Sequence, residues 1–90
     1  MGRLRVSQTS RFRKDVRRMQ RRGKDPEKLK ETIRLLASEI TLPPRFRDHA
    51  LSGNWSGWRD CHIEPDWLLL YQVSEEQLLL GRTGSHSDLF

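Results

Sequence analysis

The sequence predicts a small α+β domain, and two observations lead to this prediction. Between residues 12 and 40, apolar residues recur every three to four positions, as in amphipathic helices. Between residues 58 and 83, they follow the alternating or continuous patterns of strands. The expected order is a short N-terminal strand, a two-helix antiparallel hairpin and a three- to four-stranded antiparallel sheet. The 90 residues contain no repeat or linker, so residues 1–90 should form a single domain.

The first two elements are expected before residue 23. Leu4 and Val6 alternate with polar residues, which predicts a short strand with one buried face. Thr9 or Ser10 can then cap a helix, because a side-chain oxygen there accepts a hydrogen bond from a free backbone amide. The apolar stripe of this helix consists of Phe12, Val16 and Met19. Gly23 is expected to end the helix.

A second helix is expected after Asp25, which can cap it ahead of a proline at the first helical position, Pro26. Its apolar stripe consists of Leu29, Ile33, Leu36 and Ile40. Pro43-Pro44 then prevents the helix from continuing. Because only a short connection separates the two helices, they should form an antiparallel hairpin.

The rest of the chain is expected to form an antiparallel meander. Strands are predicted at residues 58–63, 67–73 and 78–83, with turns at Pro65-Asp66 and at residues 74–77. The two helices should cover one face of this sheet and leave the other face partly open. A functional site is therefore expected on the open face.

The charge is distributed unevenly along the chain. Residues 1–47 contain 15 Lys and Arg against five acidic residues, whereas residues 48–90 contain two Arg against seven acidic residues. Such asymmetry favours a polyanionic partner, although a solvated charged face is the alternative. The cations of the first predicted helix, which are candidates for RNA and ribosome binding, are Arg11, Arg13, Lys14, Arg17, Arg18, Arg21 and Arg22.

Several classes of protein are disfavoured by what the sequence lacks. No apolar run approaches the roughly 18 residues of a membrane span, and the first residues contain no apolar signal region. Because no such span is present, no membrane partner is expected. A single cysteine, Cys61, cannot form an internal disulfide, so a cytoplasmic location is expected. The histidines do not follow a zinc-ligand spacing, and no glycine-rich phosphate loop is present, so no metal or cofactor is expected.

All three histidines lie in the second half of the chain, and the only two arginines of that half lie near them in the sequence. Histidine can both donate and accept a proton near neutral pH, so two histidines, or one histidine and one carboxylate, suffice for RNA cleavage without a metal. His86 is the strongest candidate, because its polar C-terminal segment offers no packing role and a terminus of this kind is expected to be docked. For His49 and His62, a structural role in a loop or strand is the alternative.

The chain resembles the YafQ toxins of the RelE/ParE superfamily, which belong to bacterial type II toxin–antitoxin systems. The matching segments are residues 48–51, 53–55, 57–71 and 82–90. The most specific parts are the His-Ile-Glu-Pro-Asp stretch at residues 62–66 and the C-terminal Gly-Ser-His and Leu-Phe. The resemblance covers essentially the whole chain. It implies a RelE-like microbial RNase fold and a ribosome-dependent endoribonuclease that cuts mRNA in the A site by metal-free acid–base chemistry with 2′-OH attack.

The resemblance also implies the site residues. These are His49, His62, Asp66, Trp67, Arg82, His86 and Phe90. His86 is expected to act as general acid and Asp66 as general base, while His49 and His62 orient the phosphate or share the proton transfer. Arg82 is expected to stabilise charge on the phosphate. Phe90 and Trp67 are expected to shape the site or to stack on bases.

The expected partners follow from the same resemblance and from the charge. They are a cognate antitoxin protein, the ribosome and its mRNA, and operator DNA only as the toxin–antitoxin complex. Two alternatives share some of these features: a ParE-like toxin that inhibits DNA gyrase, and a non-catalytic RNA-binding module. Neither alternative needs three histidines and Asp66, so the sequence favours the nuclease.

Overall fold

A computed structural model describes residues 3–90 and contains five strands and three α-helices among them. The elements are β1 (Arg5–Gln8), α1 (Ser10–Arg21), α2 (Pro26–Ala37), β2 (His49–Ala50), β3 (Arg59–Glu64), β4 (Trp67–Val73), β5 (Gln77–Gly84) and α3 (His86–Leu89). Short 3-10 turns lie at Pro44–Phe46 and Gly53–Trp55. The predicted α+β class and the order of strand, two helices and meander are confirmed.

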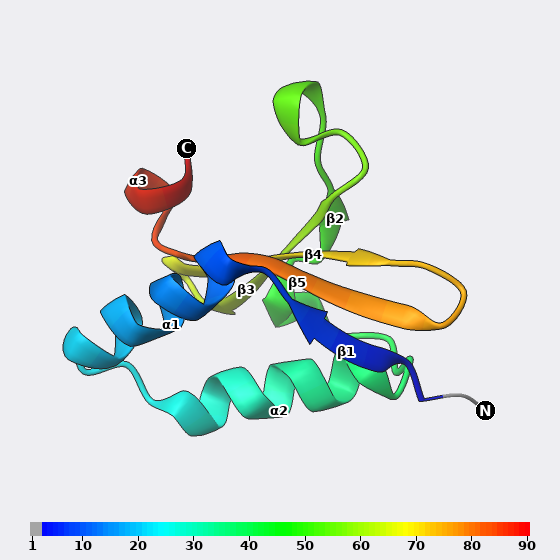
Figure 1. Ribbon diagram of the computed structural model, residues 1–90, viewed down its shortest axis with the longest axis horizontal. Helices are drawn as coiled ribbons and strands as arrows, with labels where there is room; N and C mark the ends of the chain where they lie inside the picture. The colour runs from blue at the N-terminus through cyan, green and yellow to red at the C-terminus, as the bar shows by residue number, and fades with distance from the viewer. Residues whose placement is uncertain (1–2) are drawn as a thin grey trace.

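The strands form one mixed sheet in the order β1-β5-β4-β3-β2. The meander β3-β4-β5 is antiparallel, as predicted, and β1 joins it at one edge by pairing parallel to β5 (Figure 1). The two-residue strand β2 extends the other edge by pairing with β3. The sheet therefore has five strands, which is more than the three to four that the sequence pattern indicated.

The helices α1 and α2 pack on one face of the sheet, and the residues predicted to cap them do so. The side chain of Thr9 accepts a hydrogen bond from the Phe12 amide at 3.0 Å, and Asp25 accepts one from the Glu27 amide at 2.9 Å. The chain reverses direction near Gly23, whose φ of 83° suits glycine, and the two helices form the expected hairpin (Figure 1). Their apolar stripes and the inner face of the sheet make the main core.

Two predicted core positions are wrong. The helix α2 ends at Ala37, because Ser38 caps it and Glu39 takes a left-handed conformation with φ 59°, so Ile40 lies outside the helix and is 48% exposed. Val6 is also 48% exposed, although Leu4 is buried. Because β1 is an edge strand, only one neighbouring strand flanks the Val6 side chain.

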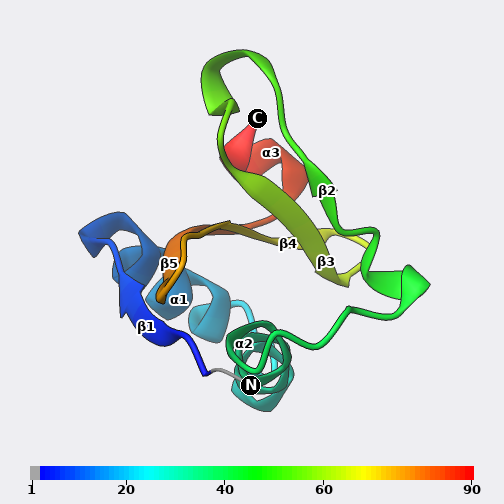
Figure 2. The same cartoon turned by 90° about the vertical axis from the view of Figure 1, so that its right-hand side faces the viewer.

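The opposite face of the sheet carries a smaller core, and α3 covers part of it. Leu68 and Leu70 of β4 pack there against Leu89 of α3, with Trp55 and Trp58 partly buried beside them. Figure 2 shows α3 on one side of the sheet and the α1–α2 hairpin on the other. The face that was expected to be open is thus closed at one end by the C-terminal segment.

Within residues 3–90, no helix has the length and apolar character needed to cross a membrane.

Candidate active site

The register of the sheet places candidate residues in two rows across the strands. In the first row, His49 of β2 lies opposite Asp60, Asp60 opposite Leu70, and Leu70 opposite Arg82 of β5. Directly opposed residues project from the same face of a sheet. Because Leu70 packs against Leu89 of α3, this part of the row faces away from the α1–α2 hairpin, whereas the side chain of Arg82 reaches α1.

The second row consists of His62, Leu68 and Gly84. The chain leaves the sheet at Gly84 and turns back as α3 over this row. A methyl group on Gly84 would lie 2.9 Å from the side chain of Asp88, so glycine permits the close turn. The turn brings the imidazole rings of His86 and His62 to 5.5 Å between centroids.

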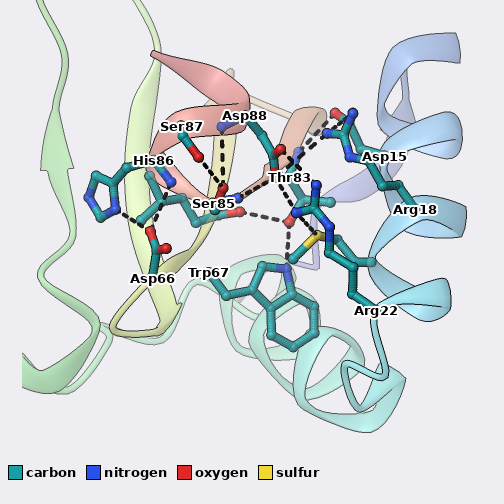
Figure 3. A network of polar contacts seen from close by, with 12 residues as sticks. Asp15, Arg18, Arg22, Asp66, Trp67, Thr83, Ser85, His86, Ser87 and Asp88 are labelled. Carbon is teal, nitrogen blue, oxygen red and sulfur yellow. Dashed lines mark hydrogen bonds and ion pairs between the residues drawn. The ribbon is translucent and has the colours of Figure 1, made fainter.

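His86 and Asp66 form the closest contact among the predicted site residues. Nδ1 of His86 donates a hydrogen bond to Oδ1 of Asp66 at 2.6 Å, and the backbone amide of His86 donates to the same oxygen at 2.9 Å (Figure 3). The backbone amide, and then the ring, lower the pKa of Asp66. Asp66 is therefore an ionised carboxylate that fixes the orientation of His86 and leaves the Nε2 atom free of that contact.

His49 is held with a defined tautomer at the other side of the site. Its Nδ1 atom lies 2.7 Å from the carbonyl oxygen of Arg47, which can only accept, so Nδ1 carries the proton. The Nε2 atom of the neutral ring is then the one that can accept a proton. It lies 3.7 Å from Oδ2 of Asp60.

Asp60 belongs to this site although it was not among the residues predicted from the sequence. It is 4% exposed, and its Oδ1 atom has no hydrogen-bond partner among residues 3–90. Burial raises the pKa of Asp60, and the nearby histidines oppose this rise. The signal in the sequence was its position two residues before His62 in a strand, which puts both side chains on one face.

Arg82 is placed differently from the prediction. Its guanidinium is paired with Asp15 of α1, with Nε 2.7 Å from Oδ2 and Nη2 3.1 Å from Oδ1. The amide of Thr83 donates to the same carboxylate at 3.2 Å. Arg82 is 9% exposed, so its charge is neutralised inside the protein and is not presented to a phosphate on the site.

Trp67 is a core residue, and the prediction that it stacks on a base is corrected. Its side chain is 1% exposed and packs in the main core beneath the α1–α2 hairpin. The indole Nε1 donates to the hydroxyl of Thr83 at 2.9 Å, and that hydroxyl donates to the carbonyl of Leu68 at 2.6 Å. Trp67 thus anchors the chain directly after Asp66.

Phe90, in contrast, presents its ring to solvent beside the site. It is 59% exposed, and its ring meets Trp55 edge to face at a centroid distance of 6.4 Å. Trp55 in turn meets Trp58 at 5.9 Å. This aromatic row offers exposed ring surface at the C-terminal end of the chain.

The seven basic residues predicted to bind RNA divide into two groups. Five of them are exposed and form no ion pair with any residue from 3 to 90: Arg11, Arg13, Lys14, Arg17 and Arg21. Arg18 is paired with Asp15 at 2.9 Å. Arg22 is paired with Asp88 of α3, in the network drawn in Figure 3.

The described part of the chain contains no group of three or more His, Cys, Asp or Glu side chains arranged to hold a metal ion.

The family model described as the bacterial toxin of type II toxin–antitoxin systems, YafQ, matches residues 4–90. The mRNA interferase toxin YafQ of Escherichia coli strain K12 is 42% identical over 86 residues, which cover 94% of each chain. The crystal structure of YafQ from E. coli strain BL21(DE3) superposes with a TM-score of 0.92 at 40% identity, covering 97% of this chain and 98% of that one.

A second similar structure contains a partner. It is the E. coli DinJ–YafQ toxin–antitoxin complex, whose matching chain has a TM-score of 0.90 and 40% identity over 98% of both chains.

Proposed function

Because the chain belongs to the YafQ family of bacterial type II toxins, we propose that it inhibits translation by cleaving mRNA on the ribosome. Two similar proteins of E. coli are mRNA interferase toxins, so this chain is an endoribonuclease of that class. The observation that carries the finer proposal is the His86–Asp66 pair, which lies with the His62 ring on an exposed face of the sheet.

The proposed reaction is a transfer of the phosphodiester to the 2′-OH of the same nucleotide. A general base removes the 2′-OH proton, the oxygen forms a bond to phosphorus, and the bond from phosphorus to the 5′ oxygen breaks. A general acid protonates that leaving oxygen. The products are a 2′,3′-cyclic phosphate and a free 5′-OH, and the protein supplies only the proton transfers and the positioning, each worth roughly 10²–10⁴-fold in rate.

The contacts support His86 as general acid. Asp66 holds Nδ1, so Nε2 is the nitrogen that can deliver a proton, and the carboxylate balances the charge of the doubly protonated ring. Asp66 is a poor candidate for the base, because its lowered pKa makes it a weak proton acceptor. We therefore assign the base to His49, whose Nε2 can take a proton, with His62 sharing or assisting that role.

The remaining predicted residues take supporting roles in this proposal. Phe90 offers the exposed ring for contact with an mRNA base. Arg82 links β5 to α1 through Asp15 and holds the strand that leads into the C-terminal segment. The five unpaired cations of α1 supply attraction to ribosomal RNA.

A cognate antitoxin is the expected protein partner, because a close structural relative is found in complex with DinJ. We propose that the antitoxin blocks the site in the cytoplasm, and that operator DNA is bound only by the toxin–antitoxin complex.

The deciding experiment is cleavage of a translated messenger on purified ribosomes. Cuts in phase with codons that disappear with His86→Ala would support the proposal. Equal cleavage of naked RNA would contradict the need for the ribosome. Absence of cleavage by well-folded protein, together with inhibition of DNA gyrase, would favour the ParE-like alternative.

A further inference from the structure

The position of His86 depends on α3, a helix too short to be stable without contacts to the rest of the chain. The helix α3 has four residues, and an isolated helix of that length is not stable in water. Its own stabilising contact is a capping box, in which Ser85 and Asp88 exchange hydrogen bonds. Its docking on the sheet therefore relies on side chains from elsewhere in the chain.

Arg22, at the C-terminal end of α1, provides a contact of this kind. Its Nη1 and Nη2 atoms donate to Oδ2 and Oδ1 of Asp88 at 2.6 and 2.9 Å, which is a bidentate geometry (Figure 3). Asp88 also accepts a hydrogen bond from the Ser85 amide at 2.8 Å. Arg18 lies farther away, with Nη2 3.9 Å from Asp88 Oδ2. The carboxylate of Asp88 thus joins the internal cap of α3 to helix α1.

We propose that Arg22 is a positioning residue, which acts through Asp88 to hold α3 so that His86 stays against Asp66. Asp88 follows His86 by two residues in the same helical turn, so a displacement of Asp88 moves the His86 backbone and breaks its bond to Asp66. The inference rests on the proposed function for its effect on cleavage. It assigns Arg22 a task different from that of the five unpaired cations on the same helix.

A double-mutant cycle separates this task from contact with ribosomal RNA. The variants are Arg22→Gln, Asp88→Asn and their combination, and Asn retains an oxygen that can accept from the Ser85 amide. Arg21→Gln is the matched control, because it removes the same charge from an exposed neighbour that has no ion pair with the described residues. The readouts are the single-turnover cleavage rate at saturating ribosomes and the dissociation constant for the ribosome.

We expect Arg22→Gln to lower the saturating rate by about tenfold, because loss of alignment acts on the rate at full binding. In the Asp88→Asn background, Arg22→Gln should have little further effect on this rate, since the pair is already broken. Arg21→Gln should combine additively with Asp88→Asn. If Arg22→Gln has the same effect in both backgrounds, or changes only ribosome affinity, the inference is overturned.

A second measurement keeps the test independent of cleavage. Hydrogen exchange of the His86 amide, which is bound to Asp66, should speed up in Arg22→Gln and Asp88→Asn and stay unchanged in Arg21→Gln. Unaltered exchange in all three variants would refute the proposed role of Arg22 even if the enzyme is active. If the proposed nuclease function is wrong, the wild-type protein will not cleave mRNA, but its His86 amide will still exchange more slowly than in Arg22→Gln and Asp88→Asn.

Discussion

At the scale of single residues, the acid–base assignment depends on the protonation of Asp66 and of the His86 ring. Asp66 accepts two hydrogen bonds from His86 through one oxygen, and these bonds lower the pKa of the carboxyl group. A group with a lowered pKa in the folded protein loses its contribution to stability only as the pH falls toward that lowered value. Asp66 is therefore ionised throughout the range in which the enzyme is expected to work.

The lowered pKa of Asp66 predicts the behaviour of Asp66→Asn. The substitution keeps an oxygen near His86 but removes the negative charge, so cleavage should slow by about 10²-fold while the protein remains folded. The acidic limb of the pH–rate profile should survive, because the pKa of Asp66 is lowered and this limb does not depend on that carboxyl group. Single-turnover rates across pH test both points, with circular dichroism as the folding control. Disappearance of the acidic limb in Asp66→Asn would indicate that Asp66 is the general base.

Local signals explain which residues could be assigned from the sequence alone. The caps Thr9 and Asp25 act on amides two or three residues away, so their partners were evident. Arg82 and Asp15 lie 67 positions apart, and their pairing depends on how α1 packs across the end of β5. Asp60 shares a strand face with His62, but its place opposite His49 depends on the register between strands. The sequence therefore predicted the types of residue at the site better than their partners.

At the scale of elements, the Arg82–Asp15 pair couples β5 to α1. Removing one partner of a buried pair leaves an uncompensated charge, so Asp15→Ala should lower the free energy of unfolding by about 3 kcal/mol. Replacing both partners by apolar residues, as in Asp15→Leu with Arg82→Met, should be less harmful. Urea denaturation measures both values. Equal destabilisation in the single and double variants would mean that the charge itself is not the source of the cost.

The turn from β5 into α3 makes a separate prediction. In Gly84→Ala, the new methyl group would meet Cβ and Oδ2 of Asp88 at 2.9 Å, so α3 must shift. Because the main core contains no residue of α3 and Thr83 keeps its hydrogen bond to Leu68, we expect a small change in stability and a fall in the cleavage rate of about tenfold or more. Ser87→Ala, at an exposed position of the same helix, is the control. Unchanged cleavage in Gly84→Ala would show that the alignment of α3 is not critical.

At the scale of the whole molecule, charge and chemistry occupy different parts of the fold. The α1–α2 hairpin, which contains most of the cations, lies on one side of the sheet, and α3 lies on the other side (Figure 2). His86 belongs to α3, and the ring of His62 lies beside it. Several cations of the hairpin are already paired, including Arg34 with Glu31 at 2.6 Å and Lys28 with Glu64 at 2.8 Å. Only unpaired cations can neutralise RNA phosphates without first breaking an internal ion pair.

The unpaired cations of α1 should therefore govern the salt dependence of ribosome binding. Changing Arg13, Lys14 and Arg17 to Gln should weaken binding and reduce the slope of log affinity against log salt concentration by about one for each RNA phosphate that the variant no longer neutralises. The cleavage rate at saturating ribosomes should change little, because these side chains do not touch the His86–Asp66 pair. The control is Arg34→Gln, which removes a cation from a pair on α2 and should leave the slope unchanged. Filter binding at several salt concentrations measures the slope, and an equal effect of Arg34→Gln would mean that total charge, and not the surface of α1, attracts the ribosome.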